Sequence, residues 1–165
     1  MKKLYFVRHA KSSWKDSTLN DFDRPLNKRG KRDAPFMGKL LKERGIKPEL
    51  IISSSAVRTT STALFFAEGM NYPPYDIIKD DNLYEAGSRD ILNIIVAIED
   101  TINSLMIFAH NPGITELYNF LSKKKIDNIP TSAVVSLTFK VDHWTQIDIN
   151  TSSLDFFEYP KKYFK

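Results

Sequence analysis

Short apolar runs alternate with segments of helical periodicity along this chain, and this alternation limits the possible fold more than any other feature. Four runs rich in β-branched, aliphatic and aromatic residues are typical of buried strands: residues 3–8, 49–53, 75–79 and 104–109. Apolar residues at helical spacing predict helices over residues 27–44, 55–69, 88–100 and 114–121. Strands that alternate with helices indicate an α/β fold, here a three-layer α/β/α sandwich around a mostly parallel sheet.

The C-terminal part of the chain departs from this alternation. Residues 133–140 and 144–150 have the pattern of two strands joined at residues 141–143, which predicts an antiparallel edge to the sheet. The aromatic and basic tail over residues 155–165 is assigned no element. Because the 165 residues contain no repeat, low-complexity tract or linker, we expect a single domain over residues 1–165.

Composition excludes several classes of protein. The chain contains no cysteine, which rules out disulfides, cysteine-ligated zinc, iron–sulfur clusters and a thiol nucleophile. No run approaches the roughly 18 apolar residues that a membrane span needs, so no membrane association is expected. The opening sequence MKKLYFVRHAK has too short an apolar stretch for a signal peptide. We therefore expect a cytoplasmic protein.

Positive charge is concentrated in the first half of the chain. Residues 1–82 carry 16 basic and 10 acidic side chains, whereas residues 83–165 carry 8 and 10. Part of the excess is the cluster Lys28, Arg29, Lys31 and Arg32. Such a cluster is either a solvated helix start or a basic rim that attracts an anionic substrate. Nucleic-acid binding is not expected, because no binding motif accompanies the small excess.

Arginine and histidine side chains follow three of the predicted strands at the point where each strand ends. The first strand ends in Arg8-His9, the second is followed by serines and then Arg58, and the last parallel strand ends in His110. Ligands collect at the carboxyl ends of strands in open α/β sheets, so we expect these four side chains to converge.

This set of residues suits phosphoryl transfer without a metal or cofactor. Two guanidinium groups match phosphate oxygens. The predicted helix that carries Arg58 in its first turn presents free backbone N–H groups at its start. Nearby positive charge favours a neutral imidazole, which is a nucleophile for phosphorus. Histidines flanked by arginines repel Zn²⁺, and no HExxH spacing is present, so no metal site is predicted.

The motifs together resemble the histidine phosphatase, or phosphoglycerate mutase-like, superfamily. The resemblance rests on LYFVRHAK with His9, SSSAVRTTSTA with Arg58, LYEA with Glu85 and FAHNPG with His110. The short length and the segments RHAKSSW, DFDRPLNKRG and AHNPG are most similar to SixA-type phosphohistidine phosphatases. The resemblance implies the phosphoglycerate mutase-like form of the α/β/α sandwich.

The same resemblance implies a role for each matching residue. His9 corresponds to the nucleophile that becomes phosphorylated, Arg8, Arg58 and His110 correspond to the phosphate pocket, and Glu85 falls where larger members place the general acid. Ala10 replaces the usual glycine of the RHG motif, and Lys15 stands where mutase-like members tend to have asparagine.

For three further side chains the sequence allows both a functional and a structural role, and for a fourth it suggests no function. Glu85 lies beside acidic residues 80–81, where an exposed carboxylate without function is nearly as well supported as an acid. Arg24 and Lys28 either reach the rim of the pocket or form structural salt bridges. His143 falls in a predicted turn and is expected to be exposed.

We therefore expect a phosphatase that works by a ping-pong reaction through a phosphohistidine enzyme intermediate. A small domain without a cap favours phosphohistidine on another protein as substrate, for example on a histidine-containing phosphotransfer domain. The alternatives are a phosphatase of small phosphorylated metabolites and a catalytically weak phosphoanion-binding module. The sequence predicts no oligomeric state.

Overall fold

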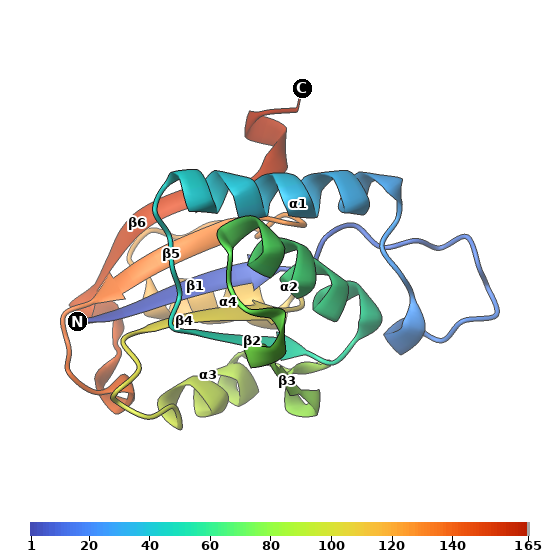
Figure 1. Ribbon diagram of the computed structural model, residues 1–165. Helices are drawn as coiled ribbons and strands as arrows, with labels where there is room; N and C mark the ends of the chain where they lie inside the picture. The colour runs from blue at the N-terminus through green and yellow to red at the C-terminus, as the bar shows by residue number, and fades with distance from the viewer. Residues whose placement is uncertain (165) are drawn as a thin grey trace.

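One six-stranded sheet forms the centre of the molecule in a computed structural model, which describes residues 1–164 (Figure 1). The strands are β1 (Lys2–Arg8), β2 (Leu50–Ser54), β3 (Ile78–Asp80), β4 (Ser104–Ala109), β5 (Val134–Phe139) and β6 (Ser152–Glu158). Their order across the sheet is β3-β2-β4-β1-β5-β6. β1, β2, β3 and β4 pair in parallel, and β5 runs antiparallel to both β1 and β6. The predicted mostly parallel sheet with an antiparallel edge is confirmed.

Helices cover both faces of this sheet, as the α/β/α prediction requires. They are α1 (Lys28–Glu43), α2 (Val57–Met70), α3 (Ser88–Val96) and α4 (Gly113–Leu121). α1 and α2 pack together on one face, and α3 and α4 pack together on the other (Figure 1). No helix within residues 1–164 combines the length and the apolar character needed to cross a membrane.

The alternation of side chains in β1 explains how one strand serves both layers. Leu4 and Phe6 belong to the apolar cluster under α3 and α4, whereas Tyr5 and Val7 belong to the cluster under α1 and α2. β1 is therefore buried on both faces and lies between β4 and β5. Its carboxyl end, where His9 follows, consequently lies in the middle of the sheet edge.

The last strand lies later in the chain than predicted, so the assignment of residues 144–150 is wrong. Those residues form two 3₁₀ turns, and β6 begins only at Ser152. The side chain of Trp144 is fully buried, and its indole N–H donates to the carbonyl of Ile102 at 2.9 Å. Asp148 then caps the second turn by accepting from the N–H of Asn150 at 2.7 Å. These side-chain bonds hold the segment out of the sheet.

Smaller differences have local causes. The strand predicted over residues 75–79 begins at Ile78, because Pro74 starts a 3₁₀ turn over Pro74–Asp76. The helix predicted over residues 88–100 ends at Val96, and its N-cap is Gly87. The start of α1 is as predicted, since the side chain of Asn27 accepts from the N–H of Gly30 at 2.9 Å.

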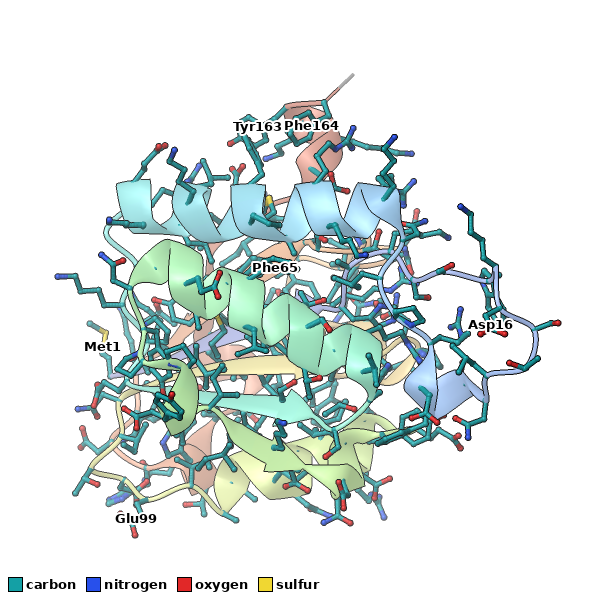
Figure 2. The ribbon with its side chains drawn as sticks, turned by 45° about the vertical axis from the view of Figure 1, so that its right-hand side comes forward. Met1, Asp16, Phe65, Glu99, Tyr163 and Phe164 are labelled. Carbon is teal, nitrogen blue, oxygen red and sulfur yellow. The ribbon has the colours of Figure 1, made fainter. Side chains whose placement is uncertain are left out.

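Two segments outside the predicted helices and strands, the C-terminal tail and the long loop before α1, lie beside α1. Residues 155–158 of the tail belong to β6, and the ring of Phe36 on α1 lies 5.3 Å from that of Tyr163 and 4.7 Å from that of Phe164 (Figure 2). The long polar loop over residues 9–27 extends from the sheet edge, with Asp16 near its tip (Figure 2). This loop returns to the start of α1 through a bridge between Ser12 and Leu26.

Candidate active site

His9 lies directly after β1 at the carboxyl edge of the sheet, and only 8% of its surface is exposed. Its backbone N–H donates to the carbonyl of Ala109 at 3.3 Å, which aligns it with the end of β4. The ring Nδ1 lies 2.8 Å from the carbonyl oxygen of Ala10. Because a carbonyl only accepts, Nδ1 carries the proton, and the lone pair of Nε2 remains for chemistry.

The surroundings of His9 keep its ring uncharged. Burial, together with the neighbouring His110, Arg58 and Arg8, lowers the pKa of His9 to about 3 against the opposing hydrogen bond to Ala10. At neutral pH the ring is therefore a neutral imidazole. A neutral imidazole with one free lone pair is a competent nucleophile.

His110 follows β4 and lies beside His9, with 5.2 Å between the two ring centroids. Its Nδ1 lies 3.4 Å from Nη2 of Arg58, and its Nε2 lies 2.8 Å from the hydroxyl of Ser54. Since a guanidinium only donates, Nδ1 accepts and Nε2–H donates to Ser54. Burial, followed by the charge of Arg58, lowers the pKa of His110 to about 4.

The two arginines present buried donors that have no partner within residues 1–164. Arg58 lies in the first turn of α2 and is 6% exposed, whereas Arg8 ends β1 and is half-buried. The Nε–H of each guanidinium is buried without a hydrogen bond. A buried unsatisfied donor costs about 1–3 kcal/mol, more when it is charged. Phosphoryl oxygens are acceptors of the kind that each of these donors lacks.

The structure thus brings His9, His110, Arg8 and Arg58 together as the strand ends predict. Among residues 1–164, no three histidine, aspartate or glutamate side chains lie close enough to share a metal ion. A sequence profile of the histidine phosphatase superfamily (branch 1) matches residues 4–94, more than half of the chain. The chain belongs to this superfamily.

Pairwise comparisons with known relatives extend the sequence similarity to most of the chain. An uncharacterised chloroplast protein of Arabidopsis thaliana is 33% identical over 135 residues, which span 76% of this chain and 61% of that protein. A 2,3-bisphosphoglycerate-dependent phosphoglycerate mutase of Corynebacterium kroppenstedtii is 34% identical over 90 residues, covering 50% of this chain and 34% of the mutase. The relatives therefore include phosphoglycerate mutases.

Solved structures agree over nearly the full length. A protein of Agrobacterium tumefaciens, provisionally described as the phosphohistidine phosphatase SixA, superposes with a TM-score of 0.81 at 28% identity. The match covers 96% of this chain and 98% of that protein. The phosphoglycerate mutase-like fold is confirmed, and the protein is a phosphatase of the histidine-nucleophile class.

In this histidine phosphatase, sequence reasoning missed Asp21. The backbone carbonyl of Asp21 accepts from Nη1 of Arg58 at 2.7 Å, and its carboxylate accepts from Nη2 at 3.0 Å. The hydroxyl of Tyr84 donates to the same carboxylate at 2.6 Å. This bond from Tyr84, with the charges of Arg58 and Arg24, lowers the pKa of Asp21 to about 2 against its partial burial. Asp21 is the first residue of the segment DFDRPLNKRG, but that segment does not reveal the contact with Arg58, because the contact requires the long loop to fold back.

Glu85 lies at the margin of the phosphatase site. The neighbouring ring of Tyr84 packs edge-on to that of His110, with 5.7 Å between centroids. The side chain of Glu85 is exposed, and it makes no hydrogen bond or ion pair within residues 1–164. Its backbone has a φ of 59°, in the left-handed region. The role of Glu85 as an acid stays a prediction.

The remaining candidates have clear places in the phosphatase fold. Ala10 is fully buried, has no positive φ, and donates its N–H to the hydroxyl of Thr62 at 2.9 Å, so it fills the glycine position without backbone strain. Arg24 forms the structural salt bridge, 3.1 Å from Asp21. Lys28 is exposed on α1. His143 is half-exposed and pairs with Asp100 at 2.8 Å, apart from the cluster around His9.

Proposed function

We propose that this protein removes phosphate from phosphohistidine side chains of other proteins, with His9 as its nucleophile. The observation that carries the proposal is the pair of buried, unpartnered Nε–H donors of Arg8 and Arg58 beside two neutral imidazoles. These donors suit the oxygens of a phosphoryl group, and the lone pair on His9 suits attack on phosphorus.

The reaction has two steps. Nε2 of His9 attacks phosphorus while the bond from phosphorus to the leaving nitrogen breaks on the opposite side. The substrate imidazole, already protonated on its other nitrogen, leaves in neutral form. Water then attacks phosphorus and releases inorganic phosphate, with Nε2 of His9 as leaving atom. Arg8 and Arg58 stabilise the charge on the phosphoryl oxygens in both steps, while Nδ1 of His110 accepts from Nη2 of Arg58 and helps to hold that guanidinium.

The state of Glu85 favours phosphohistidine over an alkyl phosphate. An alkoxide leaving group needs an acid held close to it, and the exposed carboxylate of Glu85 is held by no contact. An imidazole leaving group needs no such acid at the moment of bond cleavage. The likeness to the Agrobacterium protein supports the same substrate class.

The short loops at the sheet edge support a protein as substrate. Only residues 55–56 separate β2 from α2, and residues 110–112 separate β4 from α4. No large insertion therefore follows either strand; residues 9–27 form a long loop at this edge, and residues 122–133 also reach it before β5. A phosphorylated side chain on another protein has room to approach. The phosphoglycerate mutase relatives favour a small phosphorylated metabolite as the second candidate.

A panel of substrates tests the proposal. It includes a phosphohistidine peptide, an aryl phosphate and a sugar phosphate, each assayed with the parent and with His9→Ala. We expect the highest kcat/KM with phosphohistidine, and a loss on the order of 10³-fold or more in His9→Ala. The control is His143→Ala, which removes a histidine outside the site and should retain the parent rate.

Two results would contradict the proposal. Turnover that survives His9→Ala would exclude His9 as the nucleophile. A higher kcat/KM for the sugar phosphate than for phosphohistidine would select the metabolite phosphatase instead. A phosphoenzyme label that is acid-labile in the parent and missing in His9→Ala would confirm the covalent intermediate.

A further inference from the structure

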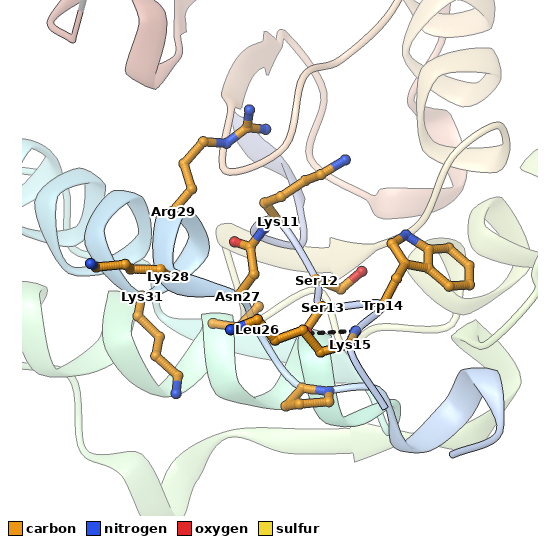
Figure 3. A pocket seen from close by; sticks show the side chains of 11 residues that line it. Lys11, Ser12, Ser13, Trp14, Lys15, Leu26, Asn27, Lys28, Arg29 and Lys31 are labelled. Carbon is orange, nitrogen blue, oxygen red and sulfur yellow. Dashed lines mark hydrogen bonds between the residues drawn. The ribbon is translucent and has the colours of Figure 1, made fainter. Parts of the chain in front are cut away.

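A groove rich in basic side chains lies next to the active site, between the start of the long loop and the start of α1 (Figure 3). Its volume is about 830 Å³. Five cationic side chains line it, and we call it the basic groove: Lys11, Lys15, Lys28, Arg29 and Lys31. No acidic side chain lines the basic groove.

Most of these charges have no counter-charge. Arg29 lies 3.9 Å from the carboxylate of Asp33. Within residues 1–164, the other four cations of the basic groove form no ion pair. Unpaired charges of one sign in a concave surface attract ligands of the opposite sign.

The position of the charges on α1 argues against a merely solvated helix start. Lys28, Arg29 and Lys31 lie at the helix N-terminus, and the first turn contains no acidic residue. The helix dipole disfavours cations there, and the cations also repel one another. Asn27 already caps the helix, so these charges oppose the stability of α1. A gain in binding would explain them.

The basic groove shares two of its residues with a hollow that contains Arg8. This second hollow of about 480 Å³ is lined by Arg8, Lys11 and Arg29, and the last two residues also line the basic groove. Lys11 follows His9 by two positions. The charge of Arg29 lowers the pKa of Arg8, second to the effect of burial, which shows that the two cations are electrostatically coupled. A ligand bound at Arg8 therefore has the basic groove as its neighbour.

An exposed aromatic side chain at the groove indicates a macromolecular partner. Trp14 is 73% exposed, and the guanidinium of Arg24 stacks on its ring at 3.5 Å from the centroid. Arg24 is in turn buried and paired with Asp21, so the indole is held in place. Exposed tryptophans that are already ordered are typical anchors of protein interfaces.

We infer that the basic groove binds acidic side chains that flank the phosphohistidine of a protein substrate. This inference rests on the proposed function and adds to it a preference for the surroundings of the phosphorylated residue. Carboxylates complement the unpaired lysines, while an adjoining apolar side chain contacts Trp14. The preference for acidic flanking residues arises from faster association with the substrate, and it becomes smaller as the salt concentration rises.

Two phosphohistidine peptides of equal length test the inference, one with aspartate and glutamate around the phosphohistidine and one with serine and glutamine. For the parent we expect kcat/KM to be about tenfold higher with the acidic peptide at low salt. The double variant Lys28→Glu/Lys31→Glu should abolish or reverse this ratio. The matched control is Lys39→Glu/Lys42→Glu, which makes the same change of net charge on exposed positions further along α1 and should keep the ratio.

The outcomes separate this inference from the proposed function. Equal rates on the two peptides, or a ratio that Lys28→Glu/Lys31→Glu leaves unchanged, would overturn the inference while hydrolysis itself stands. A parent that cleaves neither peptide would overturn the proposed function. Unfolding of Lys28→Glu/Lys31→Glu is not expected to cause the loss of the preference, because glutamates at the start of α1 interact favourably with the helix dipole. The thermal midpoint of Lys28→Glu/Lys31→Glu should therefore equal or exceed that of the parent.

Discussion

The guanidinium of Arg58 is held by both the backbone carbonyl and the carboxylate of Asp21. These two bonds determine which N–H group of Arg58 remains free for a phosphoryl group. Asp21 accepts from Nη1 through its backbone carbonyl and from Nη2 through its carboxylate. Nε–H remains without a partner within residues 1–164. Asp21 thus fixes the fork of donors while leaving one buried donor for an oxygen of the substrate. We regard Asp21 as a positioning residue for Arg58.

Asp21→Asn tests this role. The amide loses the charge that aligns Arg58, while the bond to the backbone carbonyl remains, so we expect kcat to fall about tenfold. KM should not rise, because removing a negative charge from the pocket favours an anionic substrate. Steady-state kinetics on an aryl phosphate measures both parameters.

The control for Asp21→Asn is Asp16→Asn on the same loop. The carboxylate of Asp16 is exposed and bonds to Thr18 alone within residues 1–164. Asp16→Asn should therefore retain the parent kcat. A parent-like kcat in Asp21→Asn would show that Arg58 needs no carboxylate to stay in place.

At the scale of elements, the junction between β4 and α4 is closely packed. α4 begins at Gly113, and a Cβ atom added there would lie 2.2 Å from the backbone carbonyl oxygen of Ala86. Ala86 belongs to the loop that carries Tyr84 and Glu85. The glycine of the AHNPG motif therefore lets α4 approach that loop closely.

Gly113→Ala should both destabilise the protein and reduce its activity. The added methyl group must push α4 and the loop at Ala86 apart, at a cost of about 1–3 kcal/mol. Denaturant unfolding measures this loss, and kcat should fall with it because Tyr84 moves. In Gly87→Ala the added Cβ meets no atom within 4 Å, so stability should change by no more than about 1 kcal/mol. Equal stability of the two variants would contradict this interpretation.

Sequence patterns predicted elements best where burial alone decides the structure. β1, β2 and β4 are apolar runs buried on both faces, and their bounds agree with prediction within about a residue. Prediction failed for residues 144–150, where buried Trp144 and the cap at Asp148 override a strand-like alternation. The cluster at the strand ends followed from topology, whereas Asp21 depends on a loop conformation that no local pattern encodes.

At the scale of the whole molecule, the buried histidines couple stability to pH. His9 and His110 have pKa values of about 3 and about 4 in the folded protein, below the ordinary value of 6.5. The unfolded chain therefore binds more protons below pH 6.5. The two histidines contribute fully to the free energy of unfolding above pH 6.5. This contribution is lost as the pH falls towards their pKa values in the folded protein.

We expect the free energy of unfolding to decrease between about pH 6.5 and pH 4, with a slope of up to about 1.4 kcal/mol per pH unit for each histidine. Urea unfolding at a series of pH values measures the slope. His110→Gln should reduce it, because glutamine does not titrate. A slope that is the same in the parent and His110→Gln would refute the coupling.

The central place of β1 has a consequence for how the enzyme is made. Lys3 pairs with Ser104 on one side, and Lys2 pairs with Phe139 on the other. A ribosome that has released only residues 1–100 therefore carries His9 at the end of a strand that lacks both of its neighbours. Such distant pairings form late, since the intervening chain must close first. The growing chain thus contains His9 long before both neighbours of β1 have been synthesised, and the phosphatase becomes competent only after β5 has emerged.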